Sequence, residues 1–189
     1  MVTAARWRVH RTGAGHGFTL VEALVVLALL ALLLGLAVPG LGGWRARQQL
    51  QASAEDFWNS LMLARAQAML HQQHVTLCAA SANGACDPLA AWHSGWQVFV
   101  DDNRNGQRDA GERLLLQRPA LPEAVHITGN STVSYRIGYG AEGRSEQLAG
   151  GFLAGTVSVC SEGLGEGWRL VINAVGRPRL EKAAVTGCP

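Results

Sequence analysis

Residues 25–34 form an uninterrupted apolar run, V-V-L-A-L-L-A-L-L-L, which constrains the fold more than any other feature of the sequence. Apolar residues extend it on both sides. Between Gly13 and Trp44 the only ionisable side chain besides His16 is Glu22. About 20 apolar residues cross a bilayer as a helix, so residues 18–41 are long enough to do so. The sequence therefore predicts a transmembrane helix over residues 18–41.

The residues before this run indicate its orientation. Arg6, Arg8 and Arg11 precede it without any accompanying acid, and such basic flanks stay in the cytoplasm. A secretory signal peptide also has a basic start and an apolar middle, but its cleavage site follows the apolar run. Here the small Gly-His-Gly cluster, residues 15–17, lies before it. We expect a single-pass inner-membrane anchor with a cytoplasmic N-terminus and a periplasmic C-terminal domain.

Beyond the anchor the charges balance. Of the 16 Lys and Arg residues, 13 follow Trp44, and 13 of the 14 Asp and Glu residues do the same. Any affinity of this part for nucleic acid must therefore come from a local patch of cations. The same part holds Cys78, Cys86, Cys160 and Cys188, an even number that predicts two disulfides in an oxidising compartment. Of three pairings, Cys78–Cys86 across a short turn is favoured, which leaves Cys160–Cys188.

Helical periodicity continues past the anchor. Apolar residues recur at helical spacing through Leu50, Ala54, Phe57, Leu61, Ala64 and Ala68. We expect an amphipathic half-helix over residues 42–72, separated from the first half by a kink or local unwinding near Pro39. Short strands divided by Gly, Asn and Asp clusters follow, and we predict them at residues 75–79, 95–100, 113–117, 125–128, 133–139, 155–160, 168–173 and 178–180. The predicted fold class is α+β, with a long helix packed on an antiparallel β-rich head, residues 73–189.

The motif G-F-T-L-V-E at residues 17–22, followed by the apolar run, resembles the type IV prepilin motif. The resemblance implies that residues 1–17 are a leader, that a prepilin peptidase cuts after Gly17, and that Phe18 is then methylated. It also implies that Glu22 pairs with the N-terminal amine of a neighbouring subunit. A carboxylate in an apolar helix costs a few kcal/mol unless it is paired, which agrees with that role.

Three later segments resemble the FimT/GspH group of minor pilins and pseudopilins. They are A-R-A-Q-A with V-T-L-C, the block G-W-Q-V-F-V-D-D-N-R-N-G-Q-R-D-A-G-E, and G-R-P-R near a terminal C-P. Their order favours a FimT-like minor pilin over the alternative, a type II secretion pseudopilin without a DNA role. The resemblance implies other pilins, the prepilin peptidase, the inner-membrane assembly platform and membrane lipid as partners.

The G-R-P-R segment is a candidate DNA-binding element. FimT-like proteins carry such a motif for DNA uptake in natural transformation, so the resemblance implies phosphate contacts by Arg177 and Arg179. Alternate residues of an extended segment point to one face, which would bring both guanidiniums to one double-stranded DNA backbone. Arg169 and Lys182 lie nearby in the predicted hairpin, whereas Glu181 subtracts from the patch. The alternative is an ordinary solvated hairpin.

The block D-D-N-R-N-G-Q-R-D-A-G-E has two interpretations. Asp101, Asn103, Asn105, Asp109 and Glu112 occupy the ligand positions of an EF-hand calcium loop, with a glycine at the sharp turn. The flanking segments read as strands instead of helices, which favours a hairpin loop whose side chains bond its own backbone. Calcium binding would suit a sensor or adhesion module. No other cofactor is expected, and no nucleophile or carboxylate constellation accompanies the histidines, so we do not expect an enzyme.

Overall fold

The computed structural model describes residues 18–185 and Cys188, without the side chains of residues 36–41. The chain divides into an N-terminal unit that ends at Gly42 and a head that begins at Gly43. The helix α1 (Leu20–His71) belongs to both units. The head adds nine strands and two short 3-10 helices among the described residues: β1 (Val75–Ala79), η1 (Trp92–Ser94), β2 (Trp96–Val100), β3 (Leu114–Arg118), β4 (Val125–Gly129), η2 (Ser131–Val133), β5 (Arg136–Tyr139), β6 (Ser145–Glu146), β7 (Gly155–Ser161), β8 (Glu166–Ile172) and β9 (Pro178–Ala184).

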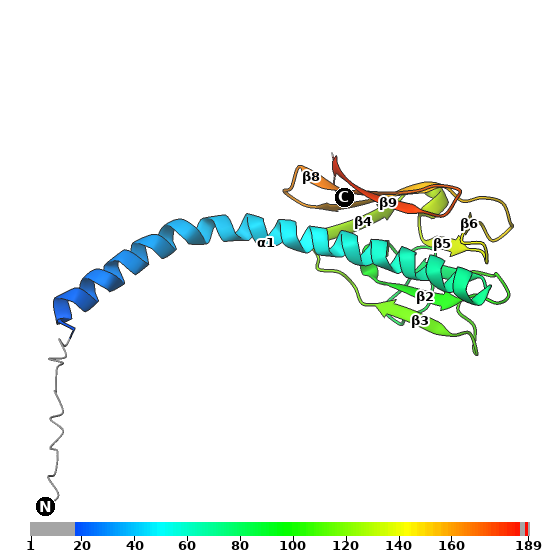
Figure 1. Cartoon of the computed structure of the whole chain (residues 1–189), viewed down its shortest axis with the longest axis horizontal. Coiled ribbons are helices and arrows are strands. Elements are labelled where there is room, and N and C mark those ends of the chain that lie inside the picture. The colour runs from blue at the N-terminus through cyan, green and yellow to red at the C-terminus, as the bar shows by residue number, and fades with distance from the viewer. Residues whose placement is uncertain (1–17, 186–187, 189) are drawn as a thin grey trace, which may run out of the picture. The chain divides into compact units, whose positions relative to one another are not determined.

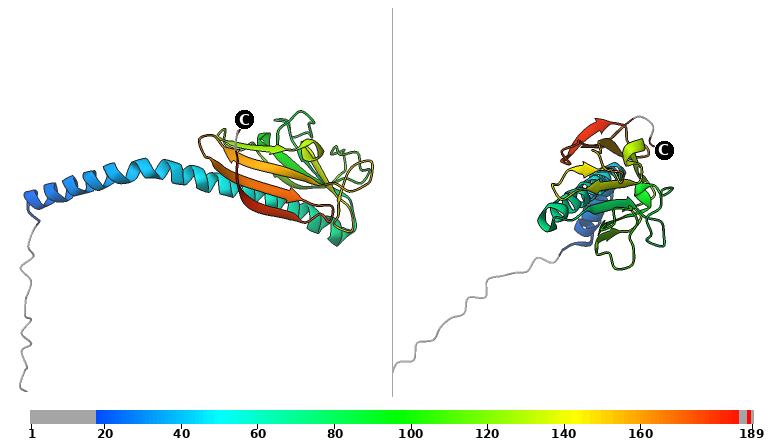
Figure 2. Two further views of the ribbon diagram at one scale, coloured as in Figure 1. Left: turned by 90° about the horizontal axis from the view of Figure 1, so that it is seen from above. Right: turned by 90° about the vertical axis from the view of Figure 1, so that its right-hand side faces the viewer.

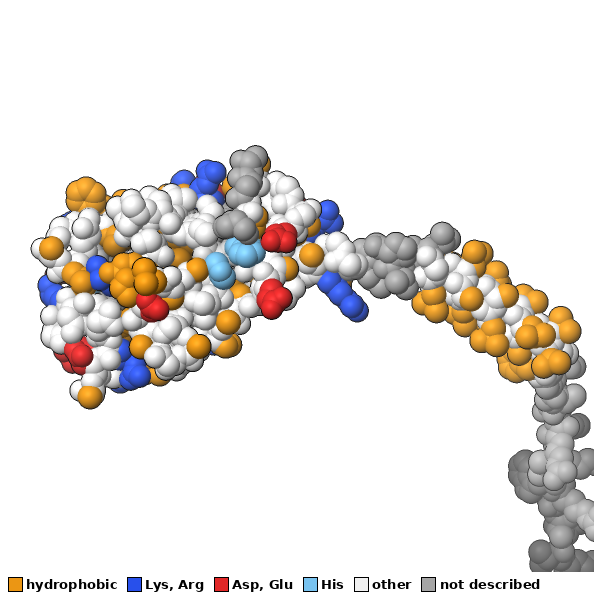
Figure 3. Space-filling model, turned by 180° about the vertical axis from the view of Figure 1, so that it is seen from behind, with side chains coloured by type: hydrophobic (Ala, Val, Ile, Leu, Met, Phe, Trp, Pro, Cys, Tyr) orange, Lys and Arg blue, Asp and Glu red, His pale blue; other side chains and the backbone are white. Residues whose placement is uncertain are grey.

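The N-terminal part of α1 begins with a side-chain cap. The backbone N–H of Glu22 donates to the Thr19 hydroxyl at 3.2 Å, an arrangement that satisfies one free donor of the first turn. Apolar side chains cover this part of the helix and are exposed (Figure 3). Among the described residues, no helix has a segment both long and apolar enough to cross a membrane. The predicted span of residues 18–41 includes six residues whose side chains are not described.

The helix runs through Pro39 without a break. The local unwinding expected there is therefore not observed: the lost hydrogen bond and the ring clash of an interior proline do not end α1 at this point.

Two antiparallel sheets make up the head. The first has the strand order β3-β2-β1-β5-β6 and the second the order β4-β7-β8-β9. All pairs of neighbouring strands are antiparallel. The C-terminal half of α1 runs along both sheets (Figures 1 and 2). The predicted α+β class, a helix packed on an antiparallel β-rich head, is confirmed.

The core forms where α1 meets the sheets. The apolar stripe predicted on the helix, which includes Leu50, Phe57 and Leu61, is fully buried. Phe57 makes edge-to-face contacts with Trp92 and Trp96, with ring centroids 5.1 and 5.3 Å away. Such aromatic pairs add stability beyond the area that they bury. All the buried residues of this core lie from Leu50 onwards, so the head carries a complete core of its own.

The predicted strands agree with the observed ones to within two residues at each end, except in three places. Residues 133–135 were expected to be strand, but η2 and a short connection precede β5, and the two-residue strand β6 was not expected. β9 is longer than predicted, since it continues from Leu180 to Ala184. The residues after Leu180 belong to the strand because β9 pairs with β8 over its full length. These residues have no alternating apolar pattern from which the extension could be predicted.

Both disulfides expected from the sequence are present. Cys78 pairs with Cys86, and Cys160 on β7 pairs with Cys188 near the C-terminus. A Cβ at Gly167 would press against the side chain of Val185 and the carbonyl of Val159, so glycine at this position leaves room for Val185 beside β8.

Candidate nucleic-acid interface

The G-R-P-R segment lies at the turn between β8 and β9. Gly176 has a positive φ of 79°, and its N–H donates to the carbonyl of Asn173 at 2.8 Å. The Asn173 side chain accepts the N–H of Arg177 at 3.2 Å. A Cβ at Gly176 would also collide with the carbonyl oxygen of Gly143. Backbone conformation and close packing both require glycine here, and they hold Arg177 at the end of the hairpin.

Strand β9 is an edge strand, a location where the proline at its first position is tolerated because it lacks a backbone N–H. The indole N–H of Trp58 on α1 donates to the carbonyl of Pro178 at 3.2 Å. Because the carbonyl groups of a strand alternate in direction, this bond shows that the unpaired edge of β9 faces α1. Pro178 itself is buried against the helix.

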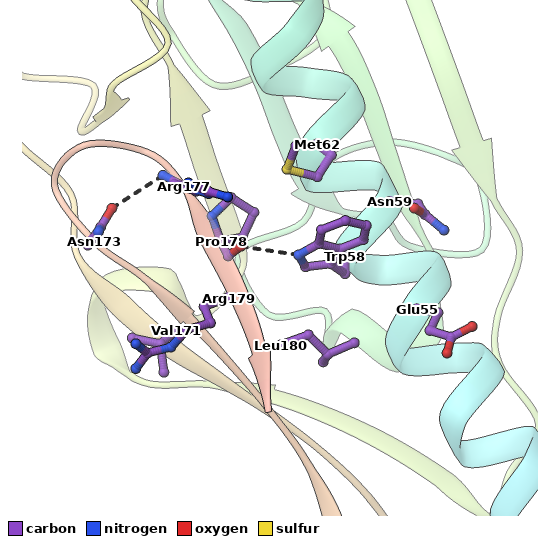
Figure 4. Close-up of a pocket in the computed structure, with 10 residues that line it drawn as sticks. All are labelled: Glu55, Trp58, Asn59, Met62, Val171, Asn173, Arg177, Pro178, Arg179 and Leu180. Carbon is purple, nitrogen blue, oxygen red and sulfur yellow. Dashed lines mark hydrogen bonds between the residues drawn. The ribbon is translucent and has the colours of Figure 1, made fainter. Parts of the chain in front are cut away.

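A groove of about 970 Å³ lies between α1 and β9. Figure 4 shows its lining residues: Glu55, Trp58, Asn59 and Met62 from α1, and Val171, Asn173, Arg177, Pro178, Arg179 and Leu180 from the hairpin. The helical side of this groove was not predicted from the sequence. Helical periodicity places Trp58 and Met62 near one face of α1. That face becomes one side of a groove only because the β8–β9 hairpin packs beside it.

The four candidate cations do not share one face. Arg169 and Arg179 lie on the outward face of the β8–β9 pair, where Glu181 lies opposite Arg169 and Arg179 lies opposite Val171. Lys182 is one residue out of phase and lies on the other face, with its ammonium 5.4 Å from the centroid of the Trp168 ring. Arg169 and Arg179 therefore share one face, and Arg177 lies in the turn just before β9. We call these three arginines the basic group of the hairpin, and Lys182 lies apart from it.

An acidic side chain interrupts this basic group. A carboxylate oxygen of Glu181 lies 3.9 Å from Nη1 of Arg169, and the other lies 3.6 Å from Nη2 of Arg179. Arg177 is exposed and has no ion-pair partner among the described residues. The electrostatic character of the hairpin therefore depends on where the Glu181 carboxylate lies.

The acidic loop between β2 and β3 is held together by its own side chains. Asp101 is buried and accepts bonds from the N–H groups of Asn105 and Gly106 and from the Thr76 hydroxyl. Asp109 accepts from the amides of Asn103 and Asn105, both at 2.7 Å.

Glu112 closes the other end of the same loop. Its two carboxylate oxygens accept the N–H groups of Asp102 and Asp109. Within the described residues no group of three or more acidic, His or Cys side chains is arranged to hold a metal ion. The side chains of all five candidate calcium ligands make hydrogen bonds within this loop, as in a hairpin loop of this composition.

The prepilin-like motif lies at the start of the described chain. Gly17 falls outside the described residues. Phe18 is 86% exposed, and Glu22 lies in the first turn of α1. In the described part of the chain the Glu22 side chain makes no hydrogen bond and no ion pair.

A long N-terminal helix whose second half packs on two antiparallel sheets, preceded by a prepilin-like motif, defines a pilin-like subunit. Residues 53–176 match the family described as Type II transport protein GspH, and residues 14–38 match the prokaryotic N-terminal methylation motif. The first match covers more than half of the chain, so this protein belongs to the GspH family.

Solved structures show the same fold. The type IV minor pilin FimU of Pseudomonas aeruginosa aligns with a TM-score of 0.55 and 22% identity over 71% of this chain and 90% of that one. The minor pseudopilin EpsH of the Vibrio cholerae type II secretion system aligns with a TM-score of 0.50 and 13% identity over 75% of this chain and 98% of that one. No curated protein matches the sequence significantly.

Proposed function

We propose that this protein is a minor pilin of a type IV pilus, cut after Gly17 and held in the inner membrane by the apolar part of α1. The observation that carries the proposal is the match of residues 14–38 to the N-terminal methylation motif, directly ahead of a GspH-family head. The exposed apolar side chains of α1 would contact lipid before assembly and neighbouring pilins afterwards. The role is structural, and its further partners are the prepilin peptidase and the assembly platform.

Processing is tested by Gly17→Ala, with Gly15→Ala as a matched control in the leader. The first variant should accumulate as an uncut precursor in the membrane fraction, whereas the second should be shortened normally. Immunoblotting of membrane fractions distinguishes the two lengths. A normally shortened Gly17→Ala product would refute the cleavage site.

The assembly role of Glu22 has its own test. Two charges that are each costly in lipid become tolerable as a pair, so Glu22 would hold the amine of Phe18 in a neighbouring subunit. Glu22→Val should leave membrane insertion intact and reduce the amount of this protein in sheared filaments. Unchanged incorporation would remove the pairing argument.

We further propose that the head binds DNA weakly and without sequence preference through Arg177 and Arg179. Three features support this: Arg177 is exposed, Arg179 is 73% exposed at the side chain, and both line one groove at the edge of the second sheet. Guanidinium groups bind phosphate oxygens in a bidentate manner. Two or three such contacts give weak, salt-sensitive binding. A type II secretion pseudopilin, the alternative function, would need no such contacts.

A DNA titration tests this second proposal. The head, residues 45–189, retains the whole core and is titrated with a labelled duplex at several salt concentrations. The double variant Arg177→Ala, Arg179→Ala should lose binding. A matched control, Arg104→Asn with Arg113→Ala, removes the same charge far along the chain, with asparagine chosen because residue 104 has a positive φ. Absence of binding at low salt would leave an assembly subunit without a DNA role.

A further inference from the structure

Glu181 lies between the two arginines of the outward sheet face. Cross-strand pairing places it opposite Arg169, and Arg179 precedes it by two residues on the same strand face. One carboxylate oxygen approaches each guanidinium. In Figure 4 the Arg179 side chain extends beside Val171, its cross-strand partner, on the side of β9 away from α1.

The two contacts of Glu181 are loose in comparison with the two other arginine–carboxylate pairs described in the head. Arg47 and Glu166 approach to 3.0 Å, and Arg118 and Asp56 to 2.8 Å. The Glu181 contacts, at 3.6 and 3.9 Å, are too long for hydrogen bonds. Among the described residues no hydrogen bond holds the Glu181 carboxylate in place. Exposed ion pairs of this kind contribute little to stability, so the carboxylate is free to leave.

We propose that Glu181 is a built-in competitor of DNA phosphate: its carboxylate occupies the position between Arg169 and Arg179 that a phosphodiester group of DNA takes on binding. This inference rests on the proposed DNA function of the same hairpin. A phosphodiester carries the same single negative charge and also presents oxygen acceptors. Arg177 is the one arginine of the group that Glu181 does not contact in the described chain, and it makes the first contact. Arg169 and Arg179 follow once Glu181 turns away.

The Glu181 carboxylate therefore lowers the affinity of the head for DNA. Replacing Glu181 with glutamine removes the competing charge but keeps the size of the side chain. Glu181→Gln should bind a labelled DNA duplex about three- to tenfold more tightly at low salt, because a negative charge beside the phosphate site is gone. The slope of log affinity against log salt should steepen by up to about 0.9 for each additional phosphate that the arginines neutralise.

The matched control is Glu162→Gln. Glu162 is exposed in the turn between β7 and β8 and contacts no arginine among the described residues, so this change alters the net charge equally without freeing a cation. Circular dichroism confirms that both variants are folded. Equal affinity of the two variants, with binding by the wild type retained, would overturn the inference and leave the DNA proposal standing. No binding by any of the three proteins at low salt would refute the DNA function and the inference with it.

A double-mutant cycle tests the mechanism. If Glu181 shields Arg169, then Arg169→Ala should change the affinity of the wild type little and should cancel part of the increase in Glu181→Gln. An equal loss in both backgrounds would show that Arg169 already contacts DNA beside Glu181. That result would contradict the proposed competition.

Discussion

The guanidinium of Arg118 binds the carboxylate of Asp56 with two of its nitrogens. Nε lies 2.8 Å from Oδ2, and Nη2 lies 2.8 Å from Oδ1. Arg118 ends β3, the edge strand of the first sheet, and Asp56 lies on α1 next to the buried Phe57. This bidentate pair joins the end of the sheet to the helix across 62 residues of sequence.

Arg118→Ala should lower the free energy of unfolding by about 1 kcal/mol, because bidentate geometry strengthens the pair while partial exposure weakens it. Arg113→Ala is the control, since Arg113 is exposed and has no ion-pair partner among the described residues. The control should stay within about 0.5 kcal/mol of the wild type in urea denaturation. Equal effects of the two changes would mean that the pair adds nothing.

Phe57→Ala should cost about 3–5 kcal/mol, because it removes a buried ring and both of its aromatic contacts. Leu89→Ala removes a side chain that is 95% exposed and should be nearly neutral. Denaturant unfolding of the head monitored by tryptophan fluorescence measures both. A loss below about 1 kcal/mol for Phe57→Ala would show that the helix is not essential to the core.

Removing the Cys160–Cys188 disulfide by double Ser substitution should cost about 3–4 kcal/mol in the chain-entropy model, and removing Cys78–Cys86 about 2–3 kcal/mol. The difference follows from the sequence separations of 28 and 8 residues. Thermal unfolding of each double variant under oxidising conditions checks the order. The reverse order would indicate that native-state packing, instead of loop closure, decides the contribution of each bridge.

Burial lowers the pKa of His74 below its ordinary value of 6.5, against the opposing effect of Asp101. Its Nδ1 has no hydrogen-bond partner among the described residues. Below about pH 6.5 the His74 imidazole takes up a proton more readily in the unfolded chain than in the folded one. The free energy of unfolding therefore falls as the pH drops below about 6.5. The other charges that act on His74 come from Arg104, Arg136 and Glu146.

His74→Gln should flatten the loss of stability between about pH 7 and pH 5 relative to the wild type. A single proton limits the difference in slope to about 1.4 kcal/mol per pH unit. Urea denaturation at a series of pH values, with His71→Gln as the control at an exposed position, measures the difference. Parallel profiles for His74→Gln and the wild type would exclude His74 as the source.

Local periodicity and local chemistry were enough to predict several features of this protein. The stripe from Leu50 to Ala68 predicted the buried face of α1, because residues three and four apart share one side of a helix. The spacing of the cysteines favoured the pairing that the structure shows. The leader motif with the apolar run agrees with the match to the N-terminal methylation motif, and the three later segments agree with the match to the GspH family.

Which of these residues meet depends on the way the elements pack. Side chains alternate between the two faces of a strand, so Lys182 and Arg179 of β9 lie on opposite faces. Pairing with β8 places Glu181 between two arginines. Strand order and register depend on partners far away in the sequence, which no local pattern records. For the same reason the groove between α1 and β9 was not predicted. Its walls are joined by the bond between Trp58 and Pro178, 120 residues apart.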